Sequence, residues 1–214
     1  MKTPYRLGDG WSIGGVNSFR TTSRPIYRRT IEDYPDSILT KYLLNAKKRH
    51  DLDTLVSIIE EYIQNNNVTA GNGWNLHIRL GDVIEKSRYS VDEHFKKLLP
   101  HSNTNFYIEP VEFFYEKIKI VKECFSEINS VTIYSSYHGS YHGGRVHHAK
   151  SDEYLKRVID IFNESGIEVN LQINNQDIDL DFVTMCKSIY FTQSRGEFSH
   201  LISLLVKYYG NCII

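Results

Sequence analysis

The sequence WNLHIRLGDVIEK, residues 74–86, combines the pattern of a buried β-strand with a charged turn at its end. Side chains alternate between the two faces of a strand, so His77 and Arg79 are predicted to share one face of residues 74–80. Arginine keeps its charge, and burying it without a partner is very unfavourable, so Arg79 must meet an anion or reach water. One interpretation is an internal ion pair with Asp82, and the other is a bound anionic ligand.

Strand patterns and helix patterns alternate from this stretch to the last residue. Strand patterns lie at residues 130–136, 167–173, 187–193 and 211–214, and helix patterns lie at residues 110–128, 151–166, 181–186 and 196–210. A capping serine at Ser151 and a terminating glycine at Gly166 mark the ends of the second of these helices. The alternation predicts an α/β fold, with a Rossmann-like parallel sheet and helices on both faces.

Two helices are predicted before the first strand. Apolar residues recur at helical spacing over residues 38–43, after a cap at Asp36, and again over residues 55–63. The chain therefore divides into a mainly helical segment, residues 1–70, and an α/β domain, residues 71–214.

Composition and charge limit the classes of function. Hydrophobic residues make up 41% of the 214 residues and charged residues 24%, as in ordinary globular domains. The net charge of −1 argues against binding nucleic acid or an anionic membrane through a basic surface. Cys124, Cys186 and Cys212 lack C-x-x-C spacing, which favours reduced thiols in a cytoplasmic protein. No apolar run reaches signal-peptide length or the roughly 20 residues of a membrane span, so we expect no membrane span.

Ligands of parallel α/β sheets bind at the carboxyl ends of the strands, where loops lead into helices. Three polar segments follow predicted strands, at residues 77–82, 135–148 and 192–200. In the third, Thr192, Ser194 and Gly196 directly precede a helix, whose unpaired N–H groups and positive dipole end favour a phosphate. In the alternative interpretation, Ser194 is an ordinary N-cap and Ser199 is a helix residue with no ligand.

Two of these segments resemble a known family when they are taken together. LHIRLGDV, residues 76–83, resembles the H-x-R-x-G-D segment of fucosyltransferases. DFVTMCKSIYFTQSRGEFSHLISLL, residues 181–205, resembles a later segment of those enzymes: an acidic residue, a buried cysteine or methionine, a strand, and an S-x-F-S-like turn into a helix. The resemblance covers residues 74–205 in order and spacing. The family is the fucosyltransferase-like branch of the GT-B glycosyltransferases, which comprises α-1,2-, α-1,6- and protein O-fucosyltransferases.

The resemblance implies a donor site for a nucleoside diphosphate sugar, most simply GDP-fucose. Arg79 would bind the β-phosphate, and Asp82 would hold that loop or contact the nucleotide. Further donor contacts are implied for Asp181, Ser194, Gly196, Phe198 and Ser199. A fixed guanidinium and preorganised N–H groups stabilise the negative charge that grows on a leaving diphosphate, so no metal or other cofactor is expected.

The expected reaction is inverting transfer of the sugar to a glycan hydroxyl. A general base should take the proton of the acceptor hydroxyl, and the candidates are His77, Asp82 and Glu197. By the same resemblance, residues 71–214 are a GT-B-like donor-binding half. Residues 1–70 are then a reduced N-terminal lobe and the candidate acceptor side.

Other features keep two further functions open. His138, His142, His147 and His148 form a candidate metal site, although a loop that covers a base or sugar, or a solvated loop, explains them as well. DIDLD, residues 177–181, resembles the D-x-D metal clamp of GT-A enzymes, but a solvated loop is favoured for Asp177 and Asp179. The alternatives are therefore a metal-dependent GT-A-like transferase or hydrolase, and a non-catalytic module that binds nucleotide sugars.

Overall fold

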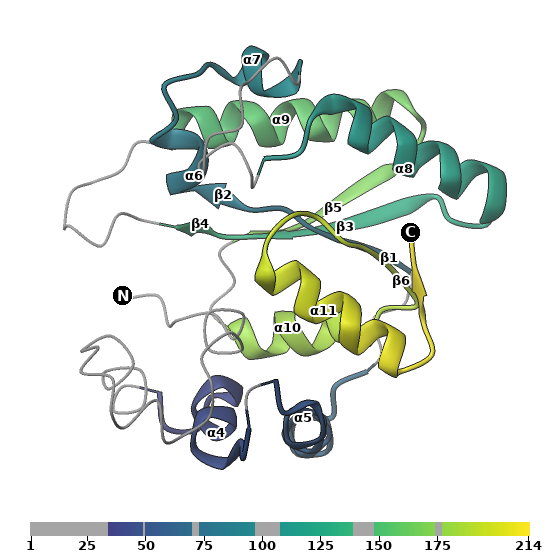
Figure 1. Cartoon of the computed structure of the whole chain (residues 1–214). Helices are drawn as coiled ribbons and strands as arrows, with labels where there is room; N and C mark the ends of the chain where they lie inside the picture. The colour runs from purple at the N-terminus through teal and green to yellow at the C-terminus, as the bar shows by residue number, and fades with distance from the viewer. Residues whose placement is uncertain (1–33, 49, 70–72, 97–107, 139–147, 174–176) are drawn as a thin grey trace.

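A five-stranded parallel sheet with helices on both faces forms the centre of the protein (Figure 1). The computed structural model describes residues 34–48, 50–69, 73–96, 108–138, 148–173 and 177–214. The strands of this sheet are β1 (Trp74–His77), β3 (Ser130–Ser135), β5 (Glu168–Ile173), β6 (Tyr190–Thr192) and β7 (Cys212–Ile213). The predicted α/β fold with a parallel sheet is confirmed.

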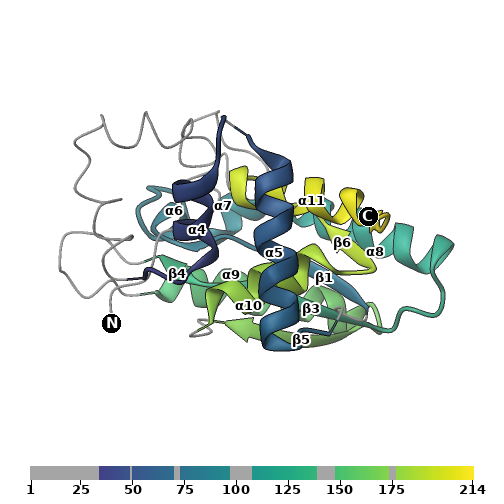
Figure 2. The same ribbon diagram turned by 90° about the horizontal axis from the view of Figure 1, so that it is seen from below.

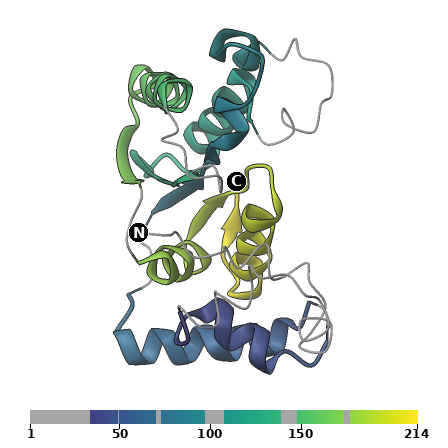
Figure 3. The same cartoon turned by 90° about the vertical axis from the view of Figure 1, so that its left-hand side faces the viewer.

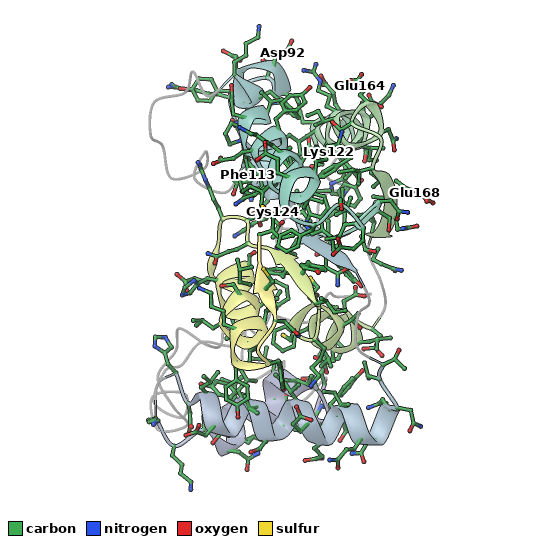
Figure 4. The ribbon with its side chains drawn as sticks, turned by 90° about the vertical axis from the view of Figure 1, so that its right-hand side faces the viewer. Asp92, Phe113, Lys122, Cys124, Glu164 and Glu168 are labelled. Carbon is green, nitrogen blue, oxygen red and sulfur yellow. The ribbon has the colours of Figure 1, made fainter. Side chains whose placement is uncertain are left out.

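The strand order places β1 between two halves of the sheet. The order is β5-β3-β1-β6-β7, so the chain runs outward from β1 to β5 and then returns to the other side of β1. Glu168 begins β5 at one edge of the sheet (Figure 4). Counted along the chain, this order is third, second, first, fourth, fifth, as in Rossmann-like sheets. In such sheets ligands bind at the point where the order reverses, which here lies between the carboxyl ends of β1 and β6.

The connecting helices cover the two faces in a way that follows from this order. The helices are α4 (Ile38–Asn45), α5 (Leu52–Asn66), α6 (Asp82–Glu85), α7 (Val91–Phe95), α8 (Val111–Cys124), α9 (Ala149–Glu164), α10 (Ile178–Cys186) and α11 (Glu197–Tyr208). Helices α8 and α9 lie on one face of the sheet, and α10 and α11 lie on the other (Figures 1 and 3). Helices α4 and α5 pack outside α10 and α11 (Figure 2).

Two apolar cores lie on opposite faces of the sheet. Trp74 and Leu76 of β1 belong to the core beneath α8 and α9, where the Trp74 ring meets the Phe162 ring edge-on at 5.3 Å between centroids. The core of the other face joins residues of α4 and α5 to residues of α10 and α11. Residues 1–33 of the predicted N-terminal lobe lie outside the described residues.

The first strand is shorter than predicted. It ends at His77 rather than at residue 80, although the N–H of Ile78 still donates to the carbonyl of Tyr134 at 2.9 Å. The chain then forms β2 (Leu80–Gly81), which pairs in parallel with β4 (Tyr137–His138) in a separate two-stranded sheet. Arg79 therefore lies at a break between two short ladders, on neither strand.

Two predicted helix caps are wrong. The N-cap of α4 is Ser37 rather than Asp36, and its hydroxyl accepts the N–H of Thr40 at 3.2 Å. Ser151 does not cap α9, because that helix begins at Ala149, and Ser151 is buried inside it. Gly166 follows α9 with a φ of 73°, so the predicted end of that helix is confirmed.

No helix among the described residues has the length and apolar character needed to cross a membrane. The cysteines Cys124, Cys186 and Cys212 are all free thiols, as predicted.

Candidate functional site

The polar segments that follow β1 and β6 meet at the carboxyl edge of the sheet. The ring of His77, the last residue of β1, lies edge-on to the ring of Phe198 in the first turn of α11, with 5.1 Å between centroids. Two of the predicted segments, residues 77–82 and 192–200, are therefore neighbours at the point where the strand order reverses.

Arg79 makes the internal ion pair that the sequence left open. Its Nη2 lies 3.7 Å from Oδ1 of Asp82, and the side chains keep 28% and 32% exposure. This separation exceeds that of a direct hydrogen bond, and exposed pairs of this kind contribute little to stability. The Arg79 side chain is therefore partly exposed, although its Nε is buried.

The loop that carries Arg79 is anchored by α9. Gly81 has a φ of 86°, a backbone conformation that favours glycine, and its N–H donates to the Ser151 hydroxyl at 3.0 Å. The N–H of Ser151 in turn donates to Oε1 of Glu85 at 2.8 Å. These bonds fix the turn between Arg79 and α6. The role of Ser151 is thus to hold this loop, which its sequence position did not indicate.

The turn before α11 has an unusual start. Gly196 occupies the N-cap with a φ of 107°, and no side chain among the described residues caps the helix there. Ser194 is therefore not the ordinary N-cap of the alternative interpretation. Its N–H donates instead to the hydroxyl of the buried Ser199 at 2.9 Å, which folds the turn back onto the helix.

The hydroxyl of Ser194 is buried at the same turn. The residue is 4% exposed, and its Oγ has no hydrogen-bond partner among the described residues. Ser135, at the end of β3, has a buried hydroxyl in the same condition. Buried polar atoms are paired in the great majority of cases, so unpaired hydroxyls at one end of a sheet are the kind of group that a polar ligand satisfies.

A buried carboxylate that the sequence reasoning missed also contacts this turn. Oε1 of Glu109 accepts the N–H of Arg195 at 2.8 Å, and its Oε2 lies 3.3 Å from Nε of the same residue. Burial raises the pKa of the Glu109 carboxyl above its ordinary value, although the Arg195 charge opposes that shift. The only sequence signal was a carboxylate set between Ile108 and Pro110 at the start of a helix.

Asp181 lies in the first turn of α10. Burial, together with the charge of Asp181, raises the pKa of Tyr134 to about 12. Tyr134 pairs with His77 across β3 and β1, so this acidic residue is close to the same end of the sheet.

The other two acidic residues of DIDLD bond to the protein itself. Asp177 is exposed, in agreement with the favoured solvated position, whereas that interpretation is wrong for Asp179, which lies partly buried in the first turn of α10. Asp177 caps α10 by accepting the N–H of Leu180 at 2.8 Å. Asp179 is partly buried, and its Oδ2 accepts the N–H of Ile38 at 2.9 Å. Both therefore join α10 to its surroundings.

The candidate base residues differ in exposure. His77 is buried against Phe198, whereas Glu197 is exposed in the first turn of α11. Asp82 stands between these extremes and faces Arg79. Glu197 is therefore the most exposed of the three candidates.

Within the part of the chain that the structure describes, no group of three or more His, Cys, Asp or Glu side chains is arranged to hold a metal ion. Of the histidine loop, His142 and His147 lie outside the described residues. His138 ends β4, and the His148 ring packs against Tyr137 with 4.6 Å between centroids.

Neither protein-family models nor curated proteins give a match to this chain. The arrangement itself combines a partly exposed arginine, a helix whose N-cap glycine has no side chain to cap it, and a buried hydroxyl. Groups of these kinds bind an anion such as a diphosphate.

Proposed function

We propose that this chain is a fucosyltransferase-like glycosyltransferase of the GT-B type. It transfers a sugar, most simply fucose from GDP-fucose, to a glycan hydroxyl with inversion and without a metal. The observation that carries the proposal is the contact between His77, at the end of β1, and Phe198 in the first turn of α11, at the reversal of strand order. It brings the arginine-bearing loop and the helix start to one edge of the sheet.

Sugar transfer from a nucleoside diphosphate is accelerated by positive charge that is already in position beside the diphosphate. Negative charge grows on the diphosphate as the glycosidic bond breaks, and Arg79 and the first N–H groups of α11 stabilise it. The Ser194 hydroxyl supplies a further donor. Asp181 contacts the nucleoside, and Phe198 lines the site from α11.

Glu197 is the best-situated general base of the three candidates. It is exposed at the start of α11, whereas His77 is buried and Asp82 faces the Arg79 guanidinium. Its carboxylate takes the proton of the acceptor hydroxyl as that oxygen attacks the sugar.

Substitution of Arg79 tests the proposal directly. Arg79→Ala should abolish transfer and weaken GDP binding, measured by a transfer assay with GDP-fucose and by calorimetry. Arg79→Lys should restore little, because an ammonium cannot bind two phosphate oxygens with the planar fork of a guanidinium. Arg157→Lys is the matched control, since Arg157 of α9 pairs with Asp92 of α7 and with Glu153 of α9. Near-normal turnover in Arg79→Lys would remove Arg79 from the assigned role.

Thermal-shift measurements with GDP-, UDP- and dTDP-sugars separate this function from its alternatives, because a ligand that binds the folded state raises its apparent stability. Binding of a donor without transfer or hydrolysis would indicate a non-catalytic module that binds nucleotide sugars. Activity that EDTA removes and Mn²⁺ or Zn²⁺ restores would indicate a metal-dependent transferase or hydrolase.

A further inference from the structure

The turn before α11 is held by two side chains, one from α11 itself and one from the residue before Pro110. The Ser199 hydroxyl accepts the N–H of Ser194 at 2.9 Å. The Glu109 carboxylate accepts the next N–H, that of Arg195, at 2.8 Å. Two consecutive peptide groups are therefore fixed immediately before Gly196, and the direction of the following N–H groups depends on both bonds.

Glu109 is itself held in place. Its side chain is buried, at 5% exposure for the residue, and its carbonyl oxygen accepts the hydroxyl of the buried Tyr154 of α9 at 2.8 Å. The following residue, Pro110, is the N-cap of α8, and a residue before proline is restricted to extended conformations. The carboxylate thus reaches the turn from a rigid backbone.

The charge of Glu109 is balanced where it stands. Its Oε2 lies 3.3 Å from Nε of Arg195, and the more distant Lys117 adds positive charge. These positive charges weaken the repulsion between this carboxylate and a diphosphate. We therefore expect the bond from Glu109 to the Arg195 backbone to affect ligand binding more than the charge of Glu109 does.

We propose that Glu109 is a positioning residue that preorganises the start of α11 for an anionic ligand. The inference rests on the proposed diphosphate site and adds to it a residue that touches no substrate. Its carboxylate fixes the Arg195 peptide, so Gly196 and the first turn of α11 present their N–H groups without rearrangement when the ligand binds. Preorganised donors lose less free energy on binding than mobile ones.

Three substitutions of Glu109 separate the effect of its side-chain length from the effect of its charge. Glu109→Gln keeps an oxygen that accepts the Arg195 N–H but removes the charge. Glu109→Asp keeps the charge but is one methylene shorter, so its oxygen falls short of that N–H. Glu109→Ala removes both. If position matters, the Ala and Asp variants should bind GDP and inorganic pyrophosphate about tenfold more weakly in calorimetry, and the Gln variant should retain most of the affinity.

Glu93 provides the matched control. Its carboxylate accepts the N–H of Ser90 at 2.7 Å at the start of α7, the same kind of bond away from the site. Glu93→Ala should leave GDP affinity unchanged. Hydrogen exchange at residues 194–198 should be faster in the Ala and Asp variants of Glu109 and unchanged in Glu93→Ala.

The outcomes distinguish the two proposals. If the parent protein binds GDP and Glu109→Asp binds it as well or more tightly, the positioning role is wrong and the proposed function stands. If Glu109→Gln loses as much GDP affinity as Glu109→Ala while Glu109→Asp keeps the parent affinity, the charge of Glu109 is what matters. That result also overturns the positioning role. If the parent protein binds neither GDP nor pyrophosphate, the proposed function fails, and with it the site that Glu109 would serve.

Discussion

At the scale of single residues, the structural roles of two aspartates in DIDLD are set by the groups they bond to rather than by the sequence motif. Asp177 and Asp179 belong to the same D-x-D pattern, yet one caps α10 and the other receives the N–H of Ile38 at the start of α4. A pattern of charges identifies the residue types, whereas the neighbouring helix determines their use. Asp179 allows a quantitative test.

Asp179 makes the stability of the protein depend on pH. Burial raises its pKa to about 6, from an ordinary value of 3.8. Between these pH values the folded state holds a proton that the unfolded state has released, so the free energy of unfolding falls as the pH rises through this window. Below the lower value the carboxyl is protonated in both states and the difference vanishes. Above the higher value it is ionised in both, and the lost stability stays constant.

Asp179→Asn should therefore be more stable than the parent protein at pH 7.5, by about 3 kcal/mol at most. The asparagine amide oxygen still accepts the Ile38 N–H, and no charge has to be buried. The advantage should disappear when urea unfolding is repeated near pH 4. A variant that is less stable than the parent at pH 7.5, with a deficit that shrinks near pH 4, would show that the ionised carboxylate stabilises the fold.

At the scale of elements, the start of α11 depends on one backbone conformation. Gly196 combines a φ of 107° with a ψ of 153°, a region that residues with a Cβ adopt only under strain. The turn needs this geometry to bring the Ser194 N–H back to Ser199 while α11 begins at Glu197. A side chain at position 196 would therefore disturb the proposed phosphate site through the backbone.

Gly196→Ala should lower the free energy of unfolding by about 1–3 kcal/mol and weaken GDP binding as well. Gly210→Ala is the matched control, because Gly210 follows α11 with a φ of 76° and open space around its Cβ position. It should lose stability but keep its affinity for GDP. Equal affinity in the two variants, measured by calorimetry, would argue against a ligand at the start of α11.

At the scale of the whole molecule, periodicity in the sequence was sufficient to predict the parallel sheet and its helices. It could not predict the contacts between segments. Glu109 and Arg195 are 86 residues apart, and their bond exists only because α8 and α11 begin near the same edge of the sheet. The early end of β1 has a similar cause, since pairing with β4 redirects the chain after Arg79. The candidate site was therefore predictable in its motifs but not in its supporting residues.

The predicted division into residues 1–70 and 71–214 does not imply that the two parts unfold separately. Residues of α4 and α5 share one apolar core with residues of α10 and α11, and Ile59 of α5 is fully buried there. Helices that share a core are expected to unfold together. The described part of the N-terminal segment should consequently melt with the sheet.

Ile59→Ala should lower the free energy of unfolding by about 2–5 kcal/mol, since it opens a cavity in that shared core. Leu44→Ala in α4 is the control, because Leu44 is 51% exposed and its loss should cost less than about 0.5 kcal/mol. Urea unfolding is followed by far-UV circular dichroism and by the fluorescence of the buried Trp74, in a Trp11→Phe background so that Trp74 reports alone. In a single cooperative unit both signals shift together to lower urea concentration in Ile59→Ala. A dichroism change that precedes the Trp74 change would instead mean that α4 and α5 unfold as a unit of their own, because the helical signal would then be lost while the sheet around Trp74 remained intact.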